Sequence, residues 1–207
     1  MSEKPYHHGD LRAAMIEKGI EIINEDGINA LSLRKVAAVC NVSHSAPYAH
    51  FSGKADLLVA IENHITDQFV NVLEESVRGS RDSPESLFKM GQAYILFFSR
   101  NPTYFSFLFS RSNVHIDLSP DSSGDYRPYE LYKRLVLTLL DKVDYPKALQ
   151  NDTIIANWAF VHGIAAVAVM SAKPCGDEWE RRIPWLLSSM RITRPEERPN
   201  LNSDKER

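Results

Sequence analysis

The stretch from Ser32 to Lys54 constrains the fold most, because it carries the start and stop signals of two short helices in close succession. Ser32 is a good N-cap residue, since its hydroxyl can accept a hydrogen bond from an unpaired backbone amide. Four apolar residues then recur with helical spacing along one face: Leu33, Val36, Ala37 and Cys40. Asn41 tolerates the left-handed conformation that ends a helix. The pattern predicts a short helix followed by a tight turn.

A second helix is expected from His44 to His50, with Ser43 as its N-cap. Pro47 falls in the first turn, where it would forfeit a single backbone hydrogen bond. Pro47 and Phe51 lie four residues apart and are expected to face inward. The positions expected to face outward are 44, 45, 48 and 49. Two helices joined in this way form a helix–turn–helix, which can place its second helix in the major groove of DNA.

The charge of this stretch fits contact with phosphates. It contains Arg34, Lys35 and Lys54 and no acidic residue, whereas the whole chain has a formal net charge of -3. That overall charge argues against a histone-like or RNA-coating protein. Lys54 opens a helix, where a cation costs about 0.3–1 kcal/mol unless an anion such as a phosphate sits there. Ser32 can meet a phosphate with its hydroxyl or amide in the same way.

The outward side chains of the second helix have distinct expected roles. His44 and Ser45 lie in the first turn, where a recognition helix contacts base edges. Tyr48 can reach a phosphate or pack on a thymine methyl group, and His50 at the helix end is expected to meet a phosphate. The alternative is an ordinary three-helix bundle with solvated charges, but the stripe lengths, turn, caps and local charge all agree on the DNA-binding interpretation.

The remaining chain is also predicted to be helical, which makes the fold class all-α with about nine helices. The expected helices cover residues 10–26, 32–40, 44–50, 54–78, 84–100, 103–110, 126–143, 151–172 and 177–191. Asn151 or Asp152 is the expected cap of the eighth, and Pro184 is expected to lie inside the ninth. We predict a DNA-binding domain at 1–53, a regulatory and dimerisation domain at 54–192 and a disordered tail at 193–207.

Composition narrows the compartment and the chemistry. The N-terminus is polar and lacks the apolar core of a signal peptide. The most apolar stretch, 154–170, is shorter than the roughly 20 residues that span a bilayer. The two cysteines, Cys40 and Cys175, are far apart and suggest no disulfide framework. We therefore expect a cytoplasmic protein.

Aromatic residues are abundant in the second half of the chain. One by one they suit a helical core, but there are more than a narrow bundle needs, so an apolar effector cavity is also possible. The residues expected to line it are Phe98, Tyr104, Phe107, Tyr132, Trp158 and His162. His162 shares a helix face with Trp158 and suits a hydrogen-bonded core histidine better than an effector or metal ligand. No other His or Cys is spaced to complete a metal site with it on this helix, so no metal or cofactor is expected.

Three segments of the N-terminal region resemble the DNA-binding domain of the TetR family of transcriptional regulators. They are 6–12 (YHHGDLR), 31–37 (LSLRKVA) and 42–58 (VSHSAPYAHFSGKADLL). The resemblance implies DNA-backbone contacts by Ser32, Ser43, Tyr48, His50 and Lys54, and base contacts by His44 and Ser45. Ala49 departs from the longer polar or basic side chain of many relatives.

A second resemblance concerns the C-terminal part. Residues 158–163 (WAFVHG) are similar to the Trp-x-x-x-His-Gly signature of one group of TetR C-terminal domains. In the family, the last two helices of each protomer pair into a four-helix dimer interface. This resemblance implies that 151–172 and 177–191 form a homodimer interface.

The leading functional hypothesis is a ligand-responsive homodimer that represses transcription from a palindromic operator. One short helix reads few base pairs, so two must act together, spaced to match turns of DNA. A small apolar or aromatic effector would tilt the helix at 54–78 and spoil that spacing. Two alternatives remain open: a helical enzyme or metal protein using His115, Asp117 or His162, and a helical adaptor that binds protein. No pairing of a nucleophile with a base supports an enzyme.

Overall fold

The computed structural model describes residues 11–81, 83–110, 116–119, 124–171 and 177–188. Within these residues the chain is all-helical, with eight α-helices, two 3-10 helices and no strand, in agreement with the predicted fold class. The elements are α1 (Leu11–Asp26), η1 (Ile28–Ala30), α2 (Leu33–Val39), η2 (Ala46–Ala49), α3 (Lys54–Ser76), α4 (Glu85–Arg100), α5 (Pro102–Ser110), α6 (Arg127–Lys142), α7 (Lys147–Met170) and α8 (Asp177–Leu187).

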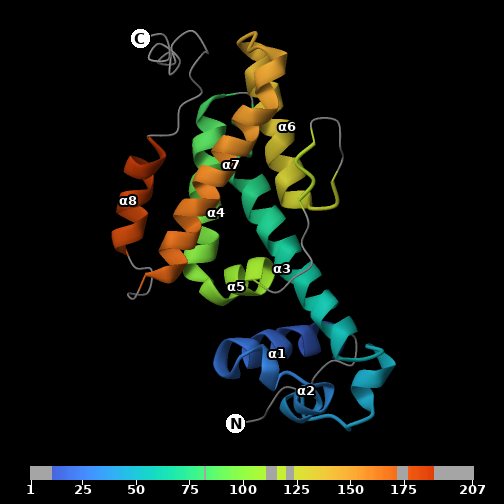
Figure 1. Ribbon diagram of the computed structural model, residues 1–207. Coiled ribbons are helices and arrows are strands. Elements are labelled where there is room, and N and C mark those ends of the chain that lie inside the picture. Colours follow the sequence, from blue (N-terminus) through green and yellow to red (C-terminus); the bar gives the residue numbers. More distant parts are fainter. Residues whose placement is uncertain (1–10, 82, 111–115, 120–123, 172–176, 189–207) are drawn as a thin grey trace, which may run out of the picture. The chain divides into compact units, whose positions relative to one another are not determined.

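The chain forms two compact units, and the division between them falls inside α3 (Figure 1). Unit 1 comprises Met1–Phe69 and Thr103–Asn113, so it includes α5. Unit 2 comprises Val70–Pro102 and Val114–Arg207. The functional domains predicted from the sequence, with a boundary at residue 53, remain a prediction.

Unit 1 is built on the packing of α1, α2 and the first part of α3. Met15 and Ile16 of α1, Val36 of α2 and Ile61 of α3 are all nearly inaccessible to solvent. Gly19 permits the close approach of α1 and α3, because a Cβ atom there would lie 2.8 Å from Ile61 Cδ1. These contacts hold the helix–turn–helix on a rigid base.

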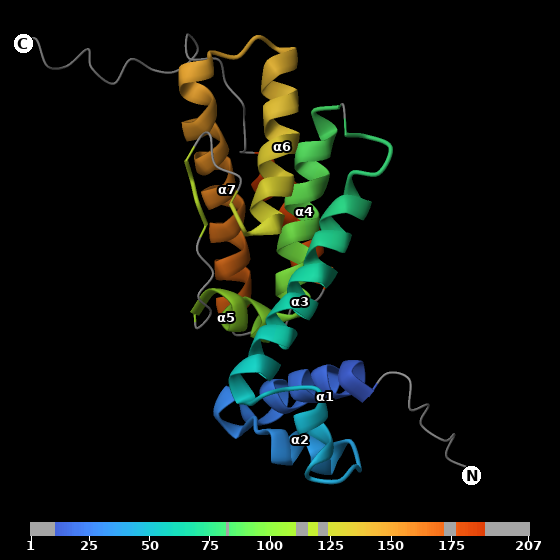
Figure 2. The ribbon, with the colours of Figure 1, turned by 90° about the vertical axis from the view of Figure 1, so that its right-hand side faces the viewer.

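Unit 2 is a bundle in which α4 and α7 pack extensively, with α6 and α8 alongside (Figures 1 and 2). Its core is rich in aromatic residues that are almost completely buried, including Tyr94, Phe98, Tyr129 and Trp158. By length and composition alone α7 could cross a membrane, but core helices meet the same criterion. Trp158 and Ala165 are buried, so one face of α7 lies in the core of the bundle.

Several element boundaries differ from the prediction. α7 begins at Lys147, directly after Pro146, so the expected cap at Asn151 or Asp152 is wrong. Pro146 explains the earlier start, since its carbonyl accepts from the amide of Leu149 and so opens the helix. Pro184 does lie inside α8, which ends at Leu187. Asp10, the predicted first residue of the first helix, lies outside the described residues.

Candidate functional site

The first helix of the predicted helix–turn–helix has the caps expected from its sequence. The Ser32 hydroxyl oxygen accepts a hydrogen bond from the amide of Lys35 at 3.1 Å. After α2, Asn41 adopts a left-handed conformation with φ of 54°. The amide of Val42 then donates to the carbonyl of Ala37 at 3.0 Å, and the Asn41 amide donates to Ala38. This pair of bonds is the Schellman motif, which turns the chain sharply.

The second helix is shorter and tighter than predicted. Only Ala46–Ala49 are helical, and they form a 3-10 turn rather than an α-helix over 44–50. The carbonyls of Ser43 and Ser45 accept from the amides of Ala46 and Tyr48. The expected side-chain cap by Ser43 is wrong, since its hydroxyl lies 3.1 Å from the Ser45 hydroxyl instead. A proline within so short a helix limits the α-helical hydrogen bonds that it can form. We call residues 44–50 the recognition turn.

The recognition turn presents its candidate DNA-contacting residues to solvent. His44, Ser45 and His50 are exposed, and Tyr48 has 64% of its surface exposed. Pro47 is buried and Phe51 is 1% exposed, so these two residues anchor the turn on unit 1, as predicted. The turn therefore separates two roles, with an apolar anchor inward and polar and aromatic side chains outward.

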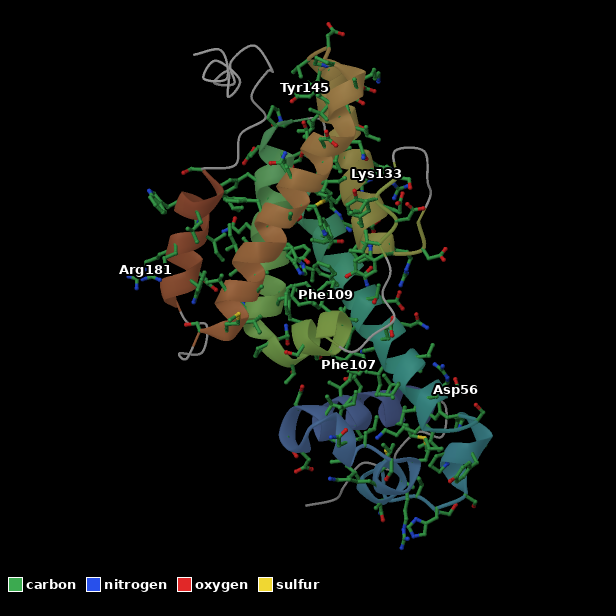
Figure 3. The ribbon with its side chains drawn as sticks, viewed as in Figure 1. Asp56, Phe107, Phe109, Lys133, Tyr145 and Arg181 are labelled. Atoms are coloured by element: carbon green, nitrogen blue, oxygen red, sulfur yellow. The ribbon has the colours of Figure 1, made fainter. Side chains whose placement is uncertain are left out.

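The charges at the start of α3 are arranged differently from the expectation. Lys54 Nζ donates to the carbonyl oxygen of Ile28 at 3.1 Å. The carboxylate of Asp56, labelled in Figure 3, accepts from the amide of Ser52 at 2.9 Å and from its hydroxyl. Asp56 thus offsets the cost of a cation at this helix end. An ammonium has three donors, so Lys54 keeps two that can meet a phosphate.

The two basic residues of α2 differ in their surroundings. Lys35 is paired with Asp26, with 2.7 Å between Nζ and Oδ2. Arg34 is exposed and forms no ion pair within the described residues. Of the basic groups on this helix, Arg34 is therefore the one that is available to a partner without breaking an ion pair.

Cys40, directly after α2, is half-buried, and burial raises the pKa of its thiol.

In unit 2, His162 belongs to a hydrogen-bonded aromatic cluster. Its Nδ1 atom lies 2.8 Å from the hydroxyl of Tyr94, and the Tyr94 ring meets Trp158 edge to face at 5.1 Å between centroids. Burial lowers the pKa of His162 and raises the pKa of Tyr94 well above its ordinary value. The predicted hydrogen bond of His162 is present, while its side chain is only partly buried.

The six residues predicted for the effector cavity are divided between the two units. Phe98, Tyr132, Trp158 and His162 belong to unit 2, whereas Tyr104 and Phe107 lie on α5 and belong to unit 1. Tyr132 and Trp158 line an enclosed cavity of about 10 Å³. That space holds roughly one water molecule. Within unit 2, Tyr132 and Trp158 are therefore buried residues beside this small cavity, and the effector cavity itself stays a prediction.

Two grooves in unit 2 were missed by sequence reasoning. The larger, which we call the α7–α8 groove, has a volume of about 670 Å³. Its lining is almost entirely apolar: Ala159, Phe160, Gly163, Ile164, Val167, Trp179, Arg182, Trp185 and Leu186. Trp185 and Val167 are 73% and 61% exposed. Large apolar side chains exposed together in this way are typical of interaction surfaces.

The second, which we call the arginine groove, has a volume of about 520 Å³. It is lined by Glu74 of α3, Val77 and Arg81 of the connection after α3, Met90 of α4, and four residues of α6, Leu131, Arg134, Leu135 and Thr138. The α6 residues follow helical spacing, which is the one signal visible in the sequence. The groove itself could not be predicted from the sequence, because its residues come from three helices and a connection.

The described residues contain no group of three or more His, Cys, Asp or Glu side chains that could hold a metal ion. Of the residues considered for an enzyme or metal site, Asp117 accepts hydrogen bonds from the amide and hydroxyl of Ser119. His115 lies outside the described residues, as does Cys175.

Comparison with known proteins finds a family match for part of the N-terminal region. Residues 15–61 match the family described as "Bacterial regulatory proteins, tetR family". The chain is 32% identical over 73 residues to the HTH-type nicotine-responsive transcriptional repressor HdnoR of Paenarthrobacter nicotinovorans. That alignment covers 35% of this chain and 38% of the repressor.

Solved structures extend the similarity to the whole fold. A transcriptional regulator of the TetR/AcrR family from Thermobifida fusca aligns with a TM-score of 0.63, 22% identity and coverage of 88% of this chain and 100% of that one. AibR in complex with isovaleryl coenzyme A and operator DNA aligns with a TM-score of 0.60, 18% identity and coverage of 86% and 97%. The N-terminal residues 15–61 therefore match the tetR family, and the chain as a whole shares the fold of these solved regulators.

Proposed function

We propose that this chain is a cytoplasmic, ligand-responsive repressor that binds a palindromic operator as a homodimer, and that it is not an enzyme. The recognition turn is the observation that carries the proposal, since it projects His44, Ser45, Tyr48 and His50 into solvent from an apolar anchor. A surface of exposed polar and aromatic side chains on a helix–turn–helix suits the major groove. The match of residues 15–61 to the tetR family supports the same function.

The proposed division of roles follows the chemistry of the side chains. His44 and Ser45 offer hydrogen-bonding groups to base edges and would carry most of the sequence preference. Ser43, Tyr48, His50 and Lys54 would contact the sugar–phosphate backbone, which fixes the register of the turn on DNA. Ser32 would add a further backbone contact, although its hydroxyl oxygen is engaged in capping α2.

The α7–α8 groove supports the proposed homodimer. Phe160 is 37% exposed, and Val167 and Trp185 are exposed more strongly. A second copy of the same helices would cover these side chains, as expected for the helices at 151–172 and 177–191. Two recognition turns in one dimer would read two half-sites about 34–36 Å apart, or a multiple of that spacing.

The proposed release of DNA requires an effector that binds one conformation of unit 2 better than another. A small apolar or aromatic effector among Phe98, Tyr132, Trp158 and His162 would have to open the aromatic core, because the existing cavity is about 10 Å³. HdnoR responds to nicotine, and AibR was solved with isovaleryl coenzyme A. The small molecules named with these two proteins therefore differ in their chemistry. The similarity of 158–163 to the Trp-x-x-x-His-Gly group remains part of the proposal.

The DNA-binding test begins with selection of genomic fragments by the purified protein, followed by sequencing and footprinting. We expect palindromic protection and an affinity that falls log-linearly with salt. Lys54→Ala should weaken binding to all DNA similarly, whereas His44→Ala should change the sequence preference. Lys18→Ala on α1, which removes an exposed cation paired with Glu21, is the control. Protection without a palindrome, or binding indifferent to both changes, contradicts the proposal.

The dimer test uses charge placed in the α7–α8 groove. Trp185→Asp should shift the protein from dimer to monomer in sedimentation experiments, because a buried unpaired carboxylate opposes association. Val143→Asp at the end of α6 is the matched control, since Val143 is also exposed, at 43%, but does not line this groove. A Trp185→Asp protein that remains dimeric at the same concentration contradicts this interface.

A further inference from the structure

The arginine groove combines two positive charges with an apolar wall. The guanidinium groups of Arg81 and Arg134 form no ion pair within the described residues, and both side chains are exposed. Glu74 also lines the groove and is likewise without an ion pair there. The three charges leave the groove with a net charge of +1, in a protein whose formal net charge is -3.

Arg81 lies within a sequence of tight turns after α3. The amide of Ser80 donates to the carbonyl of Val77 at 3.0 Å, and the amide of Ser83 donates to Ser80 at 2.9 Å. Gly79 has φ of 77°, a conformation that favours glycine. Arg134 comes from the middle of α6, so the turns after α3 and a regular helix supply the two cations.

The apolar side of the groove continues toward the aromatic core. Val77, Leu131 and Leu135 are buried side chains that line it. Met90 lines both this groove and the enclosed cavity beside Tyr132. Methionine is flexible and adapts to neighbouring groups, so a shift of this one side chain would lengthen the apolar surface available to a ligand.

We propose that the arginine groove binds an amphipathic anion, with a carboxylate or phosphate head on Arg81 and Arg134 and an apolar body over Val77, Leu131, Leu135 and Met90. Its volume of about 520 Å³ falls within the range of small-molecule sites. Arginine suits carboxylate and phosphate groups through its planar set of donors. The inference deepens the proposed function by naming an effector class, and it rests on that function only where release of DNA is concerned.

Direct binding to the full-length protein is the first test, by titration calorimetry at constant ionic strength. The probes are decanoate and decyl phosphate, which distinguish the two head groups, and 1-decanol, which has a similar body without charge. Loss of a charge-assisted hydrogen bond should weaken the anions roughly 10- to 100-fold in Arg134→Gln and in Arg81→Gln. Arg78→Gln is the matched control, because Arg78 is an exposed neighbour of Arg81 that does not line the groove. It should bind both anions as the parent protein does.

Glu74→Gln separates a ligand site from a structural network of charges. If an anion binds between the arginines, removal of this carboxylate should strengthen binding several-fold, opposite in sign to the arginine variants. Shortening decanoate to hexanoate should cost roughly fourfold per methylene buried. Equal affinity for 1-decanol and the anions, no binding by either anion, or anion binding that survives both arginine changes overturns the proposal.

The same probes test the coupling to DNA. Release of operator DNA by a bound anion supports an effector site. An anion that binds with the expected variant pattern but leaves the DNA complex unchanged upholds the groove as an anion site and contradicts its role in release. A protein that binds the anion but no DNA contradicts the proposed function while the groove stands.

Discussion

Tyr48 in the recognition turn and Trp158 in α7 are both large aromatic residues that the sequence marked as functional, yet the fold uses them in opposite ways. Tyr48 is 64% exposed, whereas Trp158 is 7% exposed and packs against Tyr94, Tyr129 and Tyr132. The recognition turn leaves its aromatic free for a partner. In the bundle of unit 2 the aromatic side chains pack against one another in the core. A ligand must therefore displace these packing contacts or bind at the surface.

The largest expected effect contrasts these two residues directly. Trp158→Ala should lower the free energy of unfolding by about 3–5 kcal/mol, because it removes a buried aromatic and leaves a cavity. Tyr48→Ala should change stability by less than about 0.5 kcal/mol, as exposed substitutions do, while weakening DNA binding. Urea unfolding at one fixed protomer concentration and a DNA-binding titration measure both outcomes. A Tyr48→Ala protein as destabilised as Trp158→Ala would contradict the comparison.

His162→Ala sharpens the comparison within the aromatic core. It removes the hydrogen bond of 2.8 Å between the His162 ring and the buried hydroxyl of Tyr94, which should cost about 1–3 kcal/mol. The control is the double variant Tyr94→Phe with His162→Ala, which removes both polar groups and should recover part of that loss. Equal stabilities of the single and double variants would show that the hydrogen bond is not the cause.

The pKa of His162 predicts a pH dependence of stability. Burial holds this pKa below its ordinary value of about 6.5, so the unfolded chain binds a proton more readily than the folded one. The contribution of His162 to stability is therefore complete above that ordinary pKa and is lost as the pH falls toward the lower, folded pKa. His162→Gln should flatten this acid-side slope, as measured by thermal unfolding between neutral and mildly acidic pH. An unchanged slope contradicts the assignment.

Local signals explain which parts of the site could be predicted. Ser32 and Asn41 act through backbone groups within a few residues of themselves, so their roles were visible in the sequence. The effector cavity rested on composition alone and stays a prediction, since Tyr104 and Trp158 belong to different units. Glu74 and Arg134 line the same arginine groove although their helices are far apart in the sequence. No local sequence pattern predicts that proximity. The start of α7 was predicted too late in the chain, because the helix begins directly after Pro146 and not at the polar residues 151 and 152.

Ser32→Ala tests the local part of the site with a smaller expected effect. Loss of the hydrogen bond from the Lys35 amide should cost about 1 kcal/mol. Ser32→Asp keeps an acceptor and should retain the cap, while its charge should weaken DNA binding. Ser52→Ala is a useful reference, since the Ser52 hydroxyl donates to Asp56 but accepts from no helix amide. A Ser32→Ala protein as stable as the parent would show that the capping bond contributes little.

Asn41→Gly should have the smallest effect, because glycine adopts a φ of 54° without steric cost. We expect a change in the free energy of unfolding within about 0.5 kcal/mol, since glycine relieves local strain but adds entropy to the unfolded chain. Asn41→Ala should be clearly worse, as a Cβ-bearing residue without a local hydrogen-bonding side chain pays about 1–2 kcal/mol in this conformation. The two variants isolate backbone geometry from side-chain contacts. If Asn41→Gly were as damaging as Asn41→Ala, the asparagine side chain itself, and not its backbone conformation, would hold the turn together.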